Sequence, residues 1–174
     1  MPIREALRLL AAEGLVLLRP GSGASVAAVS EATAREMVEV RALLEGLNAR
    51  LAAQRRDPEV LAELRDVLVR GNAATANGTA QELAGLNAEY HDLLAKAGRN
   101  GILGELMKSL RERTSIVFMA NNPTRARKDW DEHSRILEAI VDGDAELASL
   151  LATRHVHRAA EGALAHDDGE SSTQ

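Results

Sequence analysis

The sequence predicts an all-α protein: an antiparallel bundle of six or seven helices, preceded by a short helix and a β-hairpin. Apolar residues recur at helical spacing from residue 30 almost to the C-terminus. Short connections are typical of antiparallel neighbours in a bundle, and glycine, asparagine, aspartate and proline clusters provide them at residues 71–72, 77–78, 98–101, 121–123 and 142–144.

The chain is expected to have three parts. Residues 1–29 would contain a helix over 2–13 and then two short strands joined at a glycine turn. Ile3, Leu7 and Leu10 form an apolar stripe on that helix. Residues 30–166 would form the helical domain, and the acidic residues 167–174 a disordered tail.

The boundaries of the six helices after residue 30 follow from capping residues and breakers. Ser30 or Thr33 suits the N-cap of the first helix, which should end near Arg56, and Asp57 with Pro58 begins the second. The remaining helices are expected at about 80–97, 102–119, 124–141 and 145–165. The inward stripe of the first is expected to contain Met37, Val40, Leu44, Leu47 and Leu51.

Composition excludes several classes of protein. The chain has 174 residues and no cysteine, so disulfide scaffolds and thiolate metal sites are excluded. One Trp, one Tyr and one Phe cannot build a stacking platform for single-stranded nucleic acid. No apolar run approaches the roughly 20 residues that span a bilayer, and no secretory signal is recognisable, so we expect no membrane partner and a cytoplasmic location. The net charge of -5 leaves room for a small basic DNA-binding element.

Three helices place a histidine among apolar residues. Asn87 and His91 are spaced i, i+4 on the expected inward stripe of the third bundle helix, and His133 precedes an apolar face on the fifth. In the sixth helix, spacing alone leaves the choice between His155 and His157 open. Buried imidazoles need partners, which can be separate acceptors or one divalent ion shared by several nitrogens.

Arg41 lies at the edge of the stripe on the first long helix. Its spacing favours an i, i+4 ion pair with Glu45, and the alternative is a guanidinium that binds an anion inside the bundle. Tyr90 and Trp130 are interpreted as core or cavity wall. We expect no enzyme activity, because no strong candidate for an acidic general base lies on these faces.

Several motifs resemble one family. The segment PIREALRLLAAEGLVLLRPGSGASV is similar to the recognition helix and wing of GntR-superfamily transcription regulators. The rest resembles the FCD ligand-binding domain of the FadR-like branch, in VEVRALLEGLNARLAA, LNAEYHDLLAKAGRN, DEHSRILEAIVDGDAELA and LLATRHVHRA. The resemblance implies an FCD-like bundle behind a partial winged helix-turn-helix, and it covers nearly the whole chain.

The resemblance also implies a metal centre and an effector. Family members hold a divalent metal through positions that correspond here to Asn87, His91, His133 and His155, which selects His155 over His157. Asp is frequent in the family where this chain has Asn87. Zinc is the expected metal, with nickel and manganese as alternatives. A small organic acid would complete the coordination shell, with effector contacts from Arg41 and Asn100.

The DNA-binding part of the resemblance starts at the recognition helix. It implies that Arg4, Arg8 and the wing residues Gly21, Ser22 and Gly23 contact double-stranded operator DNA, read by a homodimer. The helices that precede a recognition helix are not in the sequence, so we expect either a start upstream of Met1 or a truncated regulator. The alternative functions are a DNA-incompetent partner of an intact regulator and a helical-bundle metalloenzyme.

Overall fold

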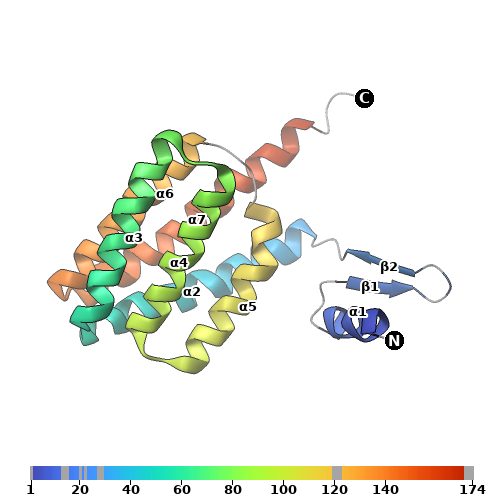
Figure 1. The fold of residues 1–174 in the computed structure, drawn as a ribbon, viewed down its shortest axis with the longest axis horizontal. Helices are drawn as coiled ribbons and strands as arrows, with labels where there is room; N and C mark the ends of the chain where they lie inside the picture. The colour runs from blue at the N-terminus through green and yellow to red at the C-terminus, as the bar shows by residue number, and fades with distance from the viewer. Residues whose placement is uncertain are drawn as a thin grey trace.

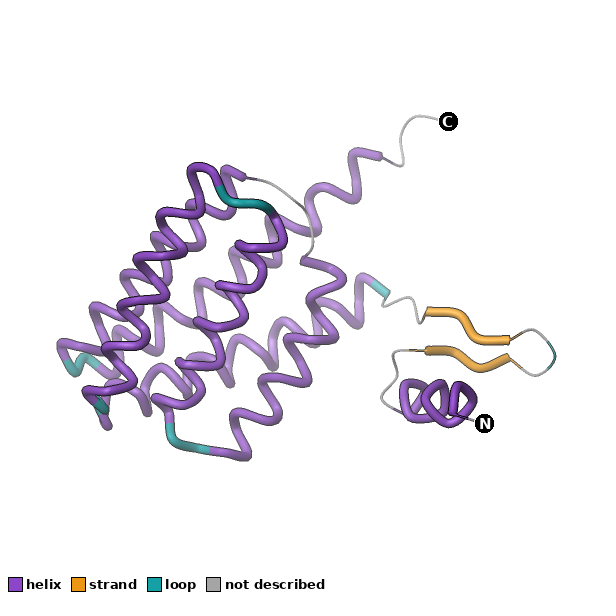
Figure 2. The backbone as a smooth tube through the Cα atoms, viewed as in Figure 1, coloured by secondary structure: helices purple, strands orange, loops and turns teal. Residues whose placement is uncertain are grey.

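The computed structural model describes residues 2–12, 16–19, 21, 23–26, 30–118 and 123–170. Within these residues six helices form a bundle, and a seventh helix and a two-stranded hairpin lie to one side of it (Figure 1). Figure 2 shows that the bundle contains helices and short connections but no strand. The predicted fold class is therefore confirmed.

The N-terminal unit consists of α1 (Pro2–Ala12), β1 (Val16–Arg19) and β2 (Gly23–Val26). The strands pair antiparallel, with Val16 opposite Val26 and Arg19 opposite Gly23. Gly21 and Gly23 have φ values of 77° and 88°, which favour glycine because a side chain would be strained there. The helix and hairpin were expected from the sequence, whereas residue 13 and Ser22 lie outside the described residues.

The apolar stripe on α1 is largely exposed. Ile3 is 74% exposed and Leu10 is 38% exposed, while Leu7 is half-buried. In the described part of the chain α1 packs mainly against β1. The hydrophobic surface expected on this helix is therefore present.

The bundle consists of α2 (Glu31–Arg55), α3 (Pro58–Asn77), α4 (Ala80–Gly98), α5 (Gly101–Phe118), α6 (Pro123–Asp142) and α7 (Ala145–Glu170). These bounds lie close to the expected ones, except at the end of α7. Residues 167–170 were expected in a disordered tail but continue the helix, and residues 171–174 lie outside the description. None of the described helices has the length and apolar character of a membrane span.

Polar side chains cap the helices where the sequence predicts boundaries. The Ser30 hydroxyl accepts a hydrogen bond from the backbone N–H of Thr33, and the Asp57 carboxylate accepts from two backbone N–H groups at the start of α3. Thr79 caps α4 in the same way, and Asp144 caps α7. Each cap satisfies N–H groups that have no partner within the helix.

The buried face of α2 differs from the expected stripe. Val40 and Leu47, expected in the core, are 49% and 42% exposed, while Arg41, Glu45 and Asn48 are buried. The cause is the close approach of α7, since a Cβ on Gly46 would lie 2.4 Å from the Thr153 hydroxyl. Alanines and polar residues of α2 therefore face the neighbouring helices, whereas Val40 and Leu47 point outward.

The leucines at the start of α7 also point outward, like Val40 and Leu47 on α2. Leu147 and Leu150 are exposed, whereas Ala148, Ala152 and Val156 are buried. Alanine fits where two helix backbones approach closely, and a leucine does not. The α2/α7 contact is therefore built from small side chains.

A second close contact joins α3 and α6, and it leads to a test of the packing. A Cβ on Gly71 would lie 2.4 Å from the buried ring of Trp130, whereas a Cβ on Gly85 would meet nothing within 4 Å. We expect Gly71→Ala to lower the free energy of unfolding by about 1–3 kcal/mol, because the indole must move. Gly85→Ala is the matched control and should raise it by about 0.5–1 kcal/mol. Urea denaturation measures both, and equal effects would contradict the packing described.

Candidate metal centre

Three histidines from three helices meet inside the bundle. His91 comes from α4, His133 from α6 and His155 from α7, and all three are buried. One ring nitrogen of each lies within 4.8 Å of those of the other two, and the Nε2 atoms of His133 and His155 are 3.1 Å apart. His157, the alternative on α7, is exposed. The three predicted histidines are thus brought together, and His157 is not part of the cluster.

Aromatic rings enclose one side of this cluster. The Tyr90 ring stacks on His133 with centroids 4.0 Å apart, and Trp130 meets His133 edge-on at 5.3 Å. The Tyr90 hydroxyl donates a hydrogen bond to the backbone carbonyl of His133. Both aromatic residues form the wall that the sequence predicted, and they hold His133 away from solvent.

The hydrogen bonds of His155 and His133 leave one nitrogen without a partner. Glu132 Oε2 lies 2.8 Å from Nδ1 of His155, which fits donation from this nitrogen to the carboxylate, and the other oxygen of Glu132 accepts from Arg158. Nε2 of His155 then offers a lone pair to His133. Among the described residues, Nδ1 of His133 is buried without a hydrogen-bond partner. Such an unsatisfied nitrogen is unusual in a core, and it lies on the other side of the ring from Nε2, which faces His155.

On another side, α2 contributes a buried ion pair. Arg41 Nε donates to Glu45 Oε1 at 2.7 Å, and its Nη1 donates to Thr114 on α5 at 3.2 Å. The second carboxylate oxygen, Oε2, lies 3.6 Å from Nδ1 of His91. The i, i+4 ion pair favoured by the sequence is therefore confirmed, and the effector contact of Arg41 stays a prediction.

Burial and charge set the protonation of these groups. Burial lowers the pKa of His91 well below its usual value, and Arg41 lowers it further. Burial also lowers the pKa of His133, with a further contribution from His155. Burial alone would raise the pKa of Glu45, but Arg41 more than offsets this, and the net pKa is below its ordinary value. His91 and His133 are thus neutral at pH 7, and the Glu45 carboxylate is ionised.

The amide residues behave differently from the histidines. Asn87 was expected on the inward stripe of α4, but its side chain is exposed, because the buried face of this helix runs through Leu86, Tyr90 and Leu94. Asn100 Oδ1 accepts a hydrogen bond from the backbone N–H of Leu103 and so caps α5. Asn100 therefore has a structural role as the cap of α5, and its contact with an effector stays a prediction.

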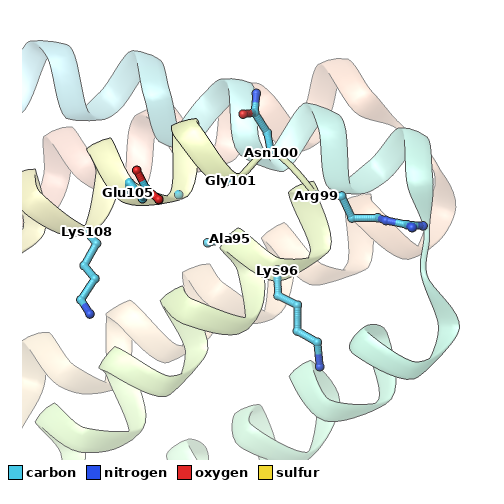
Figure 3. A pocket seen from close by; sticks show the side chains of 8 residues that line it. Ala95, Lys96, Arg99, Asn100, Gly101, Glu105 and Lys108 are labelled. Atoms are coloured by element: carbon cyan, nitrogen blue, oxygen red, sulfur yellow. The ribbon is translucent and has the colours of Figure 1, made fainter.

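Figure 3 places Asn100 at the turn between α4 and α5, beside an open pocket on the surface. Lys96, Arg99 and Lys108 line this pocket, and the Asn100 amide points away from Ala95. None of the three clustered histidines is among the lining residues. The pocket is therefore separate from the histidine cluster.

The residues predicted to contact DNA lie on α1 and the hairpin. Arg4 and Arg8 are exposed, and the Arg8 guanidinium lies 3.7 Å from Glu5. Gly21 and Gly23 flank the tip of the hairpin. Their contacts with DNA stay a prediction.

The sequence did not reveal the carboxylates around the cluster. No acidic group was expected beside the histidines, yet Glu132 bonds His155 and Glu45 lies near His91. Glu132 directly precedes His133 in the chain, but its contact is with another helix, α7. Sequence spacing carries no signal for such a contact between helices.

The donor set fits a divalent ion such as zinc. Neutral imidazoles are ordinary zinc ligands, and two nitrogens that share a tetrahedral zinc lie about 3.4 Å apart, close to the 3.1 Å between His133 and His155. A carboxylate that accepts from the second nitrogen of a metal-binding histidine is also common, and Glu132 is so placed. His91, His133 and His155 would therefore hold the ion.

Comparison with known proteins places the bundle in a family. Residues 36–158 match the FCD domain. A probable D-xylose utilization operon transcriptional repressor of Paenarthrobacter nicotinovorans is 31% identical over 169 residues, or 97% of this chain and 74% of that protein. The uncharacterized HTH-type transcriptional regulator YdhC of Bacillus subtilis is 31% identical over 84% of this chain and 67% of its own length.

Solved structures agree on the fold. The structure of McbR/YncC from Escherichia coli superposes with a TM-score of 0.80 at 23% identity, over 89% of this chain and 79% of that one. Streptococcus agalactiae GntR gives a TM-score of 0.65 at 24% identity, over 92% and 81%. The two sequence relatives are described as transcriptional regulators, not as enzymes.

The buried imidazoles make stability depend on pH. The unfolded chain binds protons below the usual histidine pKa of 6.5, whereas folded His91 and His133 do so only at lower pH. After treatment with a chelator, the free energy of unfolding should be nearly constant above pH 7. Below pH 6.5 it should fall by up to about 1.4 kcal/mol per pH unit for each histidine.

Urea denaturation at pH 7.5, 6.5 and 5.5 measures this dependence. His133→Asn should make the pH dependence shallower, because one of the two shifted groups is lost. A free energy of unfolding that stays constant down to pH 5.5 would contradict the neutral buried cluster.

Proposed function

Because this chain belongs to the FCD family of GntR-type transcription regulators, we propose that it is a DNA-binding regulator whose helical domain binds a divalent metal and a small organic acid. The observation that carries this proposal is the convergence of three buried histidines from three helices. Isolated buried histidines rarely gather in this way, because each needs its own hydrogen-bond acceptor.

In this proposal His91, His133 and His155 hold the metal. Zinc is the expected ion, with nickel or manganese as alternatives. The bound ion would supply a positive charge that attracts a carboxylate. Asn87 is the proposed fourth protein ligand, one turn before His91, and its amide would have to turn inward from its exposed position.

The proposed effector is a small carboxylic acid bound near the ion. Arg41 is the second proposed contact, since its guanidinium is buried beside the cluster and guanidinium groups pair well with carboxylates. It already bonds Glu45 and Thr114, so the acid would share it with these groups. Asn100 is a weaker proposed contact, because it caps α5.

The proposed DNA contacts come from Arg4, Arg8, Gly21, Ser22 and Gly23. Exposed arginines on one helix suit phosphate and base contacts in the major groove, and the glycine turn suits a close approach to the backbone. We also propose a homodimer, since two half-sites are normally read by a two-fold protein. Exposed apolar side chains on α2 and α7 support it, namely Val40, Leu43, Leu47, Leu147 and Leu150.

The metal proposal is tested by removing one histidine inside the cluster and one outside it. We expect His133→Ala to abolish stoichiometric metal, because the remaining two imidazoles cannot replace a central ligand. His157→Ala is the matched control on α7 and should retain one metal per chain, because His157 is exposed. Elemental analysis of protein dialysed against trace zinc measures both. Equal metal content in the two variants would contradict the proposed site.

The effector proposal predicts that acids stabilise only the metal-loaded protein. A carboxylic acid at about 100 times its Kd should raise the free energy of unfolding by about 2.7 kcal/mol. A thermal-shift screen of small mono- and dicarboxylic acids detects this. His133→Ala protein should give no shift with the same acid. Equal shifts in both proteins would place the acid elsewhere.

A further inference from the structure

A continuous polar path runs from α5 to the histidine cluster. Thr114 on α5 accepts a hydrogen bond from Arg41, which donates through Nε to Oε1 of Glu45. Oε2 of Glu45 lies 3.6 Å from Nδ1 of His91. The Glu45 side chain is only 3% exposed, so one of its oxygens is committed to Arg41 and the other faces the cluster.

The proposed ligand set carries no negative charge, and the Glu45 carboxylate lies beside it. The three histidines are neutral ligands, and so is Asn87, so the set itself contains no anion. A divalent ion in a buried site without a compensating negative charge is costly, because burial removes the water that would stabilise it. A negative charge must therefore come from outside the ligand set.

Two carboxylates lie beside the cluster, and they differ in environment. Glu132 is 16% exposed and also bonds Arg158, which is itself 52% exposed. Glu45 has no comparable access to solvent, its charge raises the pKa of Tyr90 and opposes the lowering of the His133 pKa, and its Oε2 lies 3.6 Å from Nδ1 of His91. Because buried charges are screened less by solvent than exposed ones, the charge of Glu45 is the less screened of the two.

We propose that Glu45 is a positioning residue of the metal centre: its buried carboxylate, whose Oε2 lies 3.6 Å from Nδ1 of His91, supplies the negative charge that Asn87 does not. This inference rests on the proposed metal site and adds a residue to it. Arg41 and Thr114 hold the carboxylate so that Oε2 faces the imidazole. Outer carboxylates of this kind commonly change metal affinity by about 10- to 100-fold.

Calorimetric titration of chelator-treated protein with zinc tests the inference. Glu45→Gln keeps the shape of the side chain and removes its charge, so we expect a Kd for zinc at least about 10-fold higher than in the unsubstituted protein. Glu63→Gln is the matched control, because it removes one negative charge at an exposed pair with Lys96. Its Kd should stay within about twofold.

Two further variants separate charge from structural support. Arg41→Met combined with Glu45→Gln leaves no buried charge unpaired, so it should fold even if Glu45→Gln alone does not. Because it removes a positive charge together with the negative one, its zinc affinity should lie between that of Glu45→Gln and that of the unsubstituted protein. Asn87→Asp added to Glu45→Gln restores an anion and should recover most of the affinity. Circular dichroism checks the fold of every variant.

The outcomes distinguish the two proposals. If the unsubstituted protein binds no zinc, both the proposed metal site and the role of Glu45 are wrong. If it binds zinc and folded Glu45→Gln protein binds equally well, only the role of Glu45 is overturned. If affinity falls but Asn87→Asp recovers none of it, Glu45 supports the fold and is not the source of the charge.

Discussion

The buried ion pair between Arg41 and Glu45 is the constraint on which the centre of the bundle depends. Either charge would be costly to bury alone, so both must keep their partners. Arg41 also bonds Thr114 on α5, and Oε2 of Glu45 lies 3.6 Å from Nδ1 of His91 on α4. The pair therefore fixes how α2 sits against two neighbours, in addition to the apolar contacts between them.

A buried pair of this kind is weak evidence for stability. Removing one partner typically costs about 3–5 kcal/mol, but replacing both by apolar side chains is often neutral. The position of the pair is therefore more informative than its energy. It lies on the buried face of α2, whereas the larger apolar side chains Val40, Leu43 and Leu47 are exposed. The helix α2 therefore has a partly polar inner face and an apolar outer face.

Much of the fold could be predicted because its signals are local. Capping residues such as Ser30 and Asp57 act within one helical turn, and the breaker clusters at 77–78, 98–101 and 142–144 lie at observed connections. Gly71 and Asn72, also expected at a connection, lie inside α3. The buried face of α2 could not be predicted, because the core there contains small and polar residues that a search for large apolar ones passes over. His91 and His133 could be predicted because each follows the apolar spacing of its own helix, whereas spacing left His155 and His157 open and the family resemblance selected His155. Glu132 and the contact of Glu45 with His91 were missed, because distances between helices depend on packing.

The two hydrogen bonds of Arg41 also bear on how an acid would be recognised. Glu45 already presents a carboxylate to the guanidinium, so an incoming acid would compete with a group that is permanently present inside the protein. The free energy of binding the acid to Arg41 would then be the difference between two similar carboxylate–guanidinium interactions, because the acid replaces Glu45. Such competition would make binding of the acid weak and readily reversible. The Glu45 side chain would then set the acid concentration that is needed for binding.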